Sequence, residues 1–105
     1  MPAPLSLEIS ASSTATIVRV AGEIDLDTKD DLEDALAQLG VTPRYLDVDL
    51  GEVTFIDSSG LQMLMRMHRV CQASGGVLTI RRPSPSVRSL FDIAGVNATL
   101  TIVST

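Results

Sequence analysis

The chain has 105 residues and a formal net charge of −5, which fits one domain and counts against a nucleic-acid binder. Apolar residues make up 45% and aromatic residues only 3%, so the core must be mainly aliphatic. No apolar run approaches the ~20 residues of a membrane-spanning helix, the N-terminus lacks a secretion-signal pattern, and a single cysteine excludes an internal disulfide. We therefore expect a single domain over residues 1–105 that is cytoplasmic and monomeric and binds no membrane.

The first elements in chain order are two predicted strands, at residues 5–9 and 14–21, with a hairpin turn at 11–13. Gly22 is expected to end the second strand. A helix then begins after Asp27 or Thr28, either of which can cap it, and runs to about residue 39 with Gly40 as its stop. Its buried stripe is Leu32, Ala35, Leu36 and Leu39.

The second half of the chain continues to alternate strands and helices. After a break at Pro43, a strand is expected at 45–50, followed by an apolar run at 53–56. A helix begins after Asp57 and ends near Gly75, and a strand follows at 77–81. Ser84 and Pro85 predict the start of another helix, which Gly95 ends before a last strand near 100–103. This order, β-β-α-β-α-β-α(-β), predicts an α/β fold with a mixed sheet.

The acidic residues are concentrated in the first half of the chain. Residues 1–57 hold 12 acidic and 3 basic side chains, and many of the acids lie between residues 23 and 34. One interpretation is a solvated helix whose first turn carries acids because the helix dipole favours them there. The other is a negative surface that steers a basic partner. The two interpretations are compatible.

The segment Asp57-Ser58-Ser59-Gly60 stands between an apolar strand pattern and a helical pattern. It therefore places two hydroxyls at a helix N-terminus. A phosphate there would meet free backbone N–H groups and the positive end of the dipole. A simple alternative is that Asp57 or Ser58 only caps the helix and Gly60 only permits close packing.

Enzymatic chemistry finds little support in the sequence. His68, the only histidine, lies about 15 Å along the same helix from Ser58 and cannot serve as its base. It shares a stripe with Leu61, Leu64 and Cys71, which predicts a core or boundary position. The single lysine, Lys29, is not in a phosphate-binding loop, and no residues have metal-ligand spacing. We expect a protein that is not an enzyme and uses no cofactor or metal.

Three segments of the chain, in order, resemble the STAS family of sulfate transporters and anti-sigma factor antagonists. Their sequences are GEIDLDT at 22–28, VTFIDSSGL at 53–61 and SPSVRSLFDIAG at 84–95. The match is strongest with the small bacterial anti-anti-sigma factors. The second segment resembles their phosphorylation motif nearly residue for residue.

The resemblance implies a partner-switching cycle. The unmodified protein would bind an anti-sigma factor that is a serine kinase of the histidine-kinase-like ATPase type, and so release a sigma factor. The kinase would then phosphorylate Ser58, with Ser59 as the second choice, and a PP2C-type phosphatase would reverse the reaction. By position in the family motifs, Asp25 lies beside the acceptor serine and Thr28 follows in the same loop. The expected partner-binding residues are Asp25, Thr28, Asp57, Ser59, Gly60, Gln62, Met63 and Arg66.

Two alternatives remain open from the sequence. STAS subunits also bind ABC-transporter ATPases or sit in signalling scaffolds, although those often lack the acceptor serine that this chain has. One flank of the second long helix consists of Met63, Met67 and Val70, and it suits a docking surface because methionine adapts to irregular partners. The same residues could instead pack against neighbouring helices.

Overall fold

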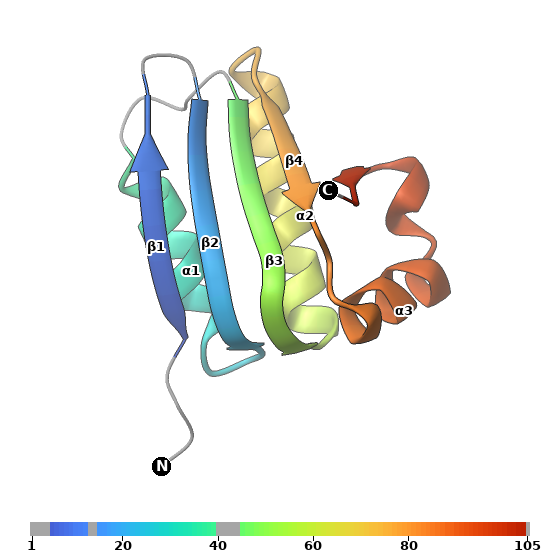
Figure 1. Cartoon of the computed structure of the whole chain (residues 1–105). Helices are drawn as coiled ribbons and strands as arrows, with labels where there is room; N and C mark the ends of the chain where they lie inside the picture. The colour runs from blue at the N-terminus through green and yellow to red at the C-terminus, as the bar shows by residue number, and fades with distance from the viewer. Residues whose placement is uncertain (1–4, 13–14, 40–44, 105) are drawn as a thin grey trace.

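A computed structural model describes residues 5–12, 15–39 and 45–104 and shows a five-stranded sheet with helices (Figure 1). Strands and helices alternate as the sequence predicts, and the terminal strand is present. In chain order the elements are β1 (Ser6–Ala11), β2 (Ala15–Ile24), α1 (Lys29–Ala37), β3 (Tyr45–Ile56), α2 (Ser58–Ala73), β4 (Val77–Arg81), α3 (Pro85–Ala94), a 3-10 turn (Val96–Ala98) and β5 (Thr101–Val103).

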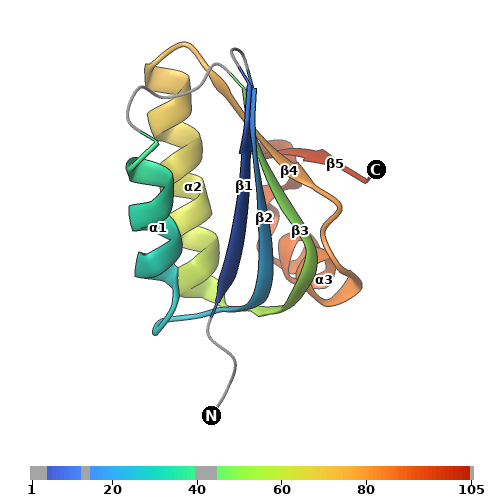
Figure 2. The same cartoon turned by 60° about the vertical axis from the view of Figure 1, so that its left-hand side comes forward.

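The sheet has the order β1-β2-β3-β4-β5. Strand β1 is antiparallel to β2, and the three remaining pairs are parallel. The prediction of a mixed sheet is therefore confirmed. Helices α1 and α2 lie on the same face of the sheet (Figure 2). This follows because β2, β3 and β4 are neighbours in sequence order, and right-handed crossovers then place both connecting helices on one side. The aliphatic core between these helices and the sheet includes Val18, Leu32, Val48, Leu64 and Ile80.

Two strands are longer than the sequence pattern predicts. Gly22 does not end β2: it has a φ of 109°, and the strand continues to Ile24. Strand β3 also passes through Gly51 without a break. Its pairing with β2 contains two bulges, because Arg19 and Ala21 pair with Asp49 and Glu52, and a second shift follows after Gly22. Each bulge places one extra residue in β3 and reverses the alternation of its side chains.

Helix α3 lies beside the lower half of β3, beyond the end of the shorter β4 (Figure 1). The hydroxyls of Ser84 and Ser86 donate hydrogen bonds to the carbonyl oxygens of Val53 and Thr54, at 2.6 and 3.1 Å. Ser84 is the N-cap residue, as predicted, but its side chain bonds to β3 rather than to the helix. Pro85 begins the helix, and Gly95, at a φ of 70°, ends it.

The remaining boundaries agree closely with the predicted ones. Helix α1 follows Thr28 but ends at Ala37, two residues before the predicted position. Strand β4 and helix α2 match their predicted ranges within about two residues. The predicted roles of Ser13, Gly40 and Pro43 fall outside the described residues. None of the helices in the described part is long and apolar enough to cross a membrane.

Candidate functional site

The candidate site forms where β2 and β3 end. Because the two strands are parallel, their carboxyl ends meet at one edge of the sheet, and the segments that follow them lie side by side (Figure 1). The N–H of Asp57 donates to the carbonyl oxygen of Ile24 at 3.1 Å and ties the two segments together. The loop that begins at Asp25 therefore starts next to the first turn of α2.

Asp57 is the N-cap of α2. Its Oδ1 accepts the N–H of Gly60 at 3.0 Å and the hydroxyl of Ser59 at 2.6 Å. Partial burial raises the pKa of this carboxyl, but hydrogen bonds from the Ser59 hydroxyl and the N–H groups of Gly60, Ser59 and Leu26 outweigh it. The net effect is a pKa below the usual value, so Asp57 is charged at neutral pH. The predicted capping role of Asp57 is confirmed.

The two serines of the turn differ in their surroundings. Ser58 is exposed, and its hydroxyl makes no hydrogen bond to the described residues. The hydroxyl of Ser59 is half-buried and is held by Asp57. Of the two, Ser58 is therefore the more accessible to a modifying enzyme, whereas Ser59 contributes to the geometry of the turn.

Gly60 is buried at the closest contact between the two segments. A Cβ at this position would lie 2.7 Å from Cγ2 of Ile24, 2.9 Å from Cγ1 of Ile56 and 3.0 Å from the carbonyl oxygen of Ile24. These distances leave no space for a methyl group. Gly60 therefore supports the site by allowing close approach and offers a partner no side chain.

The loop between β2 and α1 is held by its own polar groups. Oδ1 of Asp25 accepts the N–H groups of Asp27 and Thr28, at 2.9 and 3.1 Å. The hydroxyl of Thr28 donates to the carbonyl oxygen of Glu23 at 2.7 Å and accepts the N–H of Asp25. Thr28 consequently leaves the first turn of α1 without a side-chain cap. These bonds fix the shape of the loop beside Ser58.

Along α2, Gln62 lies one turn after Ser58 and shares its exposed face. Arg66 follows on the same face, and its guanidinium makes a two-point pair with Glu33 of α1, at 3.1 and 3.0 Å. Met63 is completely buried, and Met67 is 7% exposed. The prediction that Met63 contacts a partner is therefore wrong: Met63 and Met67 pack into the core, whereas Val70, the third residue of that flank, is 48% exposed.

Sequence reasoning missed two exposed apolar side chains at this edge of the sheet. Leu26, in the loop after β2, is 69% exposed, and Phe55, near the end of β3, is 47% exposed. The second bulge in β3 accounts for Phe55, because an extra residue before it turns its side chain out of the core. Leu26 gave a usable signal, since it is an apolar residue between two aspartates in a loop.

The lone histidine and the lone cysteine of the chain have structural positions in the core. His68 is buried in the stripe with Cys71, as predicted, and is far from the turn. Burial raises the pKa of the Cys71 thiol, which keeps it protonated and unreactive. Within residues 5–12, 15–39 and 45–104, no group of three potential ligands could hold a metal ion.

The fold and the serine turn together define a STAS domain. The family model described as "Mlab, STAS domain" matches residues 7–104, so the chain belongs to this family. It is 29% identical over 85 residues to a STAS-domain containing protein of Pseudomonas aeruginosa, covering 81% of this chain and 84% of that one.

Two further relatives are named for a regulatory role. The anti-sigma-B factor antagonist of Bacillus subtilis is 27% identical over 92 residues, covering 88% of this chain and 84% of the relative. The crystal structure of an anti-sigma factor antagonist from Mycobacterium paratuberculosis superposes with a TM-score of 0.87 at 26% identity, covering 100% of this chain and 92% of that one. These names agree with the prediction that the chain is not an enzyme.

The cap at Asp57 yields a prediction for stability. Asp57→Ala removes the acceptor of the Gly60 N–H and should lower the free energy of unfolding by about 1 kcal/mol.

The Asp57→Asn variant tests the charge of the cap separately, because it keeps an acceptor but loses the charge. Folding lowers the pKa of Asp57 below the unfolded value near 3.8. The charged carboxylate therefore contributes fully to the free energy of unfolding above that value, and this contribution is lost as pH falls through the folded-state pKa. Urea denaturation of the wild type and Asp57→Asn from pH 7 to 2 should show the two curves converging in acid. Parallel curves would contradict the assignment.

Proposed function

We propose that this protein is an anti-sigma factor antagonist that is switched by phosphorylation of Ser58. The observation that carries the proposal is the exposed Ser58 hydroxyl at the first turn of α2, without a hydrogen-bond partner among the described residues. In the unmodified state it binds an anti-sigma factor kinase of the histidine-kinase-like ATPase type in the cytoplasm. In the phosphorylated state it dissociates, and a PP2C-type phosphatase restores it.

The fold tolerates a phosphate at Ser58 for an electrostatic reason. Ser58 is the first residue of α2, and its side chain lies at the end where backbone N–H groups lack helical partners. The carboxyl of Asp57 accepts the N–H groups of Gly60 and Ser59, which leaves the N–H of Ser58 itself to meet an added anion. The dipole of a 16-residue helix adds a favourable positive potential at this end. Phosphorylation therefore requires little rearrangement inside the protein.

A bound partner experiences the same phosphate differently. Phosphorylation adds about 1.5 to 2 negative charges and three strong acceptors to a group that was a neutral hydroxyl. An interface that fits the hydroxyl would have to desolvate this dianion. The carboxylate of Asp57, the residue before Ser58, adds like-charge repulsion. The switch is thus local and needs no change of the backbone.

Two large exposed apolar residues, Leu26 and Phe55, come from the two segments that are joined at the Ser58 turn. The exposed residues Leu26, Phe55 and Gln62, together with Ser58, are termed the docking surface below. Two large apolar side chains supply the contact area that anchors a partner. Asp30 and Asp31, in the first turn of α1, follow Leu26 closely in the chain and favour a partner with basic residues at the rim.

The direct test is a phosphotransfer assay. The purified chain is incubated with ATP, Mg²⁺ and each histidine-kinase-like ATPase with serine kinase activity that the same genome encodes. Mass spectrometry should place one phosphate on Ser58, none in Ser58→Ala, and normal labelling in Ser59→Ala. A phosphate confined to Ser59 would overturn the choice of acceptor. Stable binding to an ABC-transporter ATPase with no labelling by any kinase would favour the transporter-subunit alternative.

The docking surface yields a second prediction. Leu26→Ala should weaken kinase binding about tenfold, because truncating a well-packed anchor typically loses more than 1 kcal/mol. Val70→Ala is a matched control: Val70 is 48% exposed but lies 12 residues along α2 from Ser58, or about 18 Å. Calorimetric titration of the kinase with both variants checks the difference. Equal affinities would move the interface away from Leu26.

A further inference from the structure

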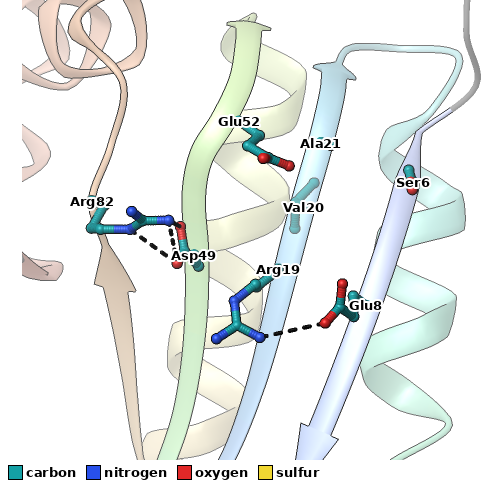
Figure 3. Close-up of a pocket in the computed structure, with 8 residues that line it drawn as sticks. All are labelled: Ser6, Glu8, Arg19, Val20, Ala21, Asp49, Glu52 and Arg82. Carbon is teal, nitrogen blue, oxygen red and sulfur yellow. Dashed lines mark hydrogen bonds and ion pairs between the residues drawn. The ribbon is translucent and has the colours of Figure 1, made fainter.

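The face of β1, β2 and β3 opposite α1 and α2 contains a cavity of about 240 Å³ (Figure 3). It is smaller than a typical pocket for a drug-sized ligand, which occupies about 300–1,000 Å³. Its polar lining comes from three strands and from the residue that follows β4. These side chains are Ser6, Glu8, Arg19, Asp49, Glu52 and Arg82.

The first bulge in β3 brings Glu52 into this cavity. Without the extra residue, regular alternation would place the side chains of Asp49 and Glu52 on opposite faces of the sheet. The bulge between the pairs Arg19–Asp49 and Ala21–Glu52 puts both carboxylates on the outer face. Glu52 makes no hydrogen bond or ion pair to any described residue, so a carboxylate lines the cavity without a cation of its own.

One wall of the cavity is formed by an ion pair between Asp49 and Arg82, whose charges cancel. Asp49 is 7% exposed and accepts the N–H of Gly51 at 2.9 Å and Nε and Nη2 of Arg82 at 3.2 and 3.1 Å. Arg82 has a φ of 51°, a left-handed conformation that strains a residue with a side chain. Its guanidinium lies over Gly51, where a Cβ would be 3.0 Å from Nη2. The first bulge of β3 and the strained backbone of Arg82 therefore lie next to each other at this wall.

The opposite side of the cavity carries Arg19. Its closest acidic atom is an oxygen of Glu8, 3.6 Å from Nη1, which is too far for a hydrogen bond. Figure 3 shows this guanidinium between Glu8 of β1 and Asp49 of β3. Its donors are therefore available for a ligand oxygen. The cavity accordingly offers one carboxylate without a cationic partner among the described residues, Glu52, and one guanidinium, Arg19, whose ion pair with the exposed Glu8 uses none of its hydrogen-bond donors.

We propose that this cavity binds a small zwitterion, an amino acid, with its ammonium at Glu52 and its carboxylate at Arg19. A guanidinium matches a carboxylate with two parallel hydrogen bonds, and an ammonium donates to a carboxylate. The Asp49–Arg82 pair closes the side of the cavity and adds no net charge. This site is separate from Ser58, and the proposal does not depend on the phosphorylation cycle.

The test is an NMR titration of the full chain, labelled with ¹⁵N, using L-glutamine, N-acetyl-L-glutamine and L-glutaminamide. L-Glutamine has the two charged groups and an uncharged side chain. We expect saturable shifts of the amides of Ser6, Ala21 and Glu52 with L-glutamine. Binding of the N-acetyl compound, which lacks the ammonium, and of the amide, which lacks the carboxylate, should be at least about tenfold weaker.

Two variants assign the two ends of the ligand. In Glu52→Gln the preference for L-glutamine over N-acetyl-L-glutamine should disappear, and in Arg19→Gln the preference over L-glutaminamide should disappear. A general loss of structure would not produce this crossed pattern. Asp34→Asn, an exposed change on α1, is the control and should bind like the wild type. Failure of L-glutamine to give saturable shifts, or equal binding of all three compounds, would overturn the proposal.

Discussion

Replacing Ser58 with aspartate should weaken binding of the anti-sigma factor kinase about 100-fold. The introduced carboxylate would occupy the centre of the docking surface, where a partner must exclude water. A buried, unpaired charge is among the most unfavourable changes at an interface, and repulsion by the neighbouring Asp57 adds to it. Isothermal titration calorimetry with the kinase in the presence of ADP measures the change.

Two variants separate charge from size at the same position. Ser58→Asn matches aspartate in shape but is neutral, so it should retain most of the affinity that Ser58→Asp loses. Ser58→Ala should bind like the wild type while blocking phosphotransfer. Since Ser58 is exposed, all three variants should keep nearly the same stability. If asparagine and aspartate weakened binding equally, steric bulk rather than charge would be the basis of the switch.

Replacing Gly60 with alanine should lower the free energy of unfolding by about 1–3 kcal/mol. The added methyl group would meet Ile24 and Ile56 at less than 3.0 Å, and the nearby carbonyl oxygen of Ile24 restricts relaxation. The intrinsic helix preference favours alanine over glycine by up to about 1 kcal/mol, so the overlap must exceed this gain. Urea denaturation of both proteins gives the difference.

Ser58→Ala is the matched control for this substitution, because it adds no contact in the same turn of α2. It should shift the unfolding midpoint by less than a quarter of the Gly60→Ala effect. The Gly60 variant should also bind the kinase more weakly, since separating Ile24 from α2 moves the loop that carries Leu26. A stabilised Gly60→Ala protein would show that the two segments can separate freely.

The alternation of elements was predictable because each has a local signal. Pro85 and Gly95 mark the two ends of α3, and Asp57 marks the start of α2. The extents of β2 and β3 were not predictable in the same way. Gly22 looks like a strand end, yet its pairing with Val53, 31 residues away in the chain, keeps it within the sheet. Such pairing and its bulges depend on the neighbouring strand rather than on local preference.

In the candidate site, too, features with a local sequence signal were predictable and features set by the surrounding fold were not. The position of Ser58 at a helix N-terminus followed from the pattern around it, and the structure adds that its hydroxyl is free while that of Ser59 is held. Met63 was misplaced because helical spacing identifies a face but not what covers that face. Phe55 was missed because its outward orientation results from a bulge. Its strand position alone carries no such information.

The hydroxyls of Ser84 and Ser86 have a consequence for solubility. Below the end of β4, the long β3 presents carbonyl groups that no strand meets, and these two side chains satisfy two of them. A sheet margin left open in this way is a template for another chain. Helix α3 therefore covers part of an edge of β3 that could otherwise pair with a strand of a second molecule.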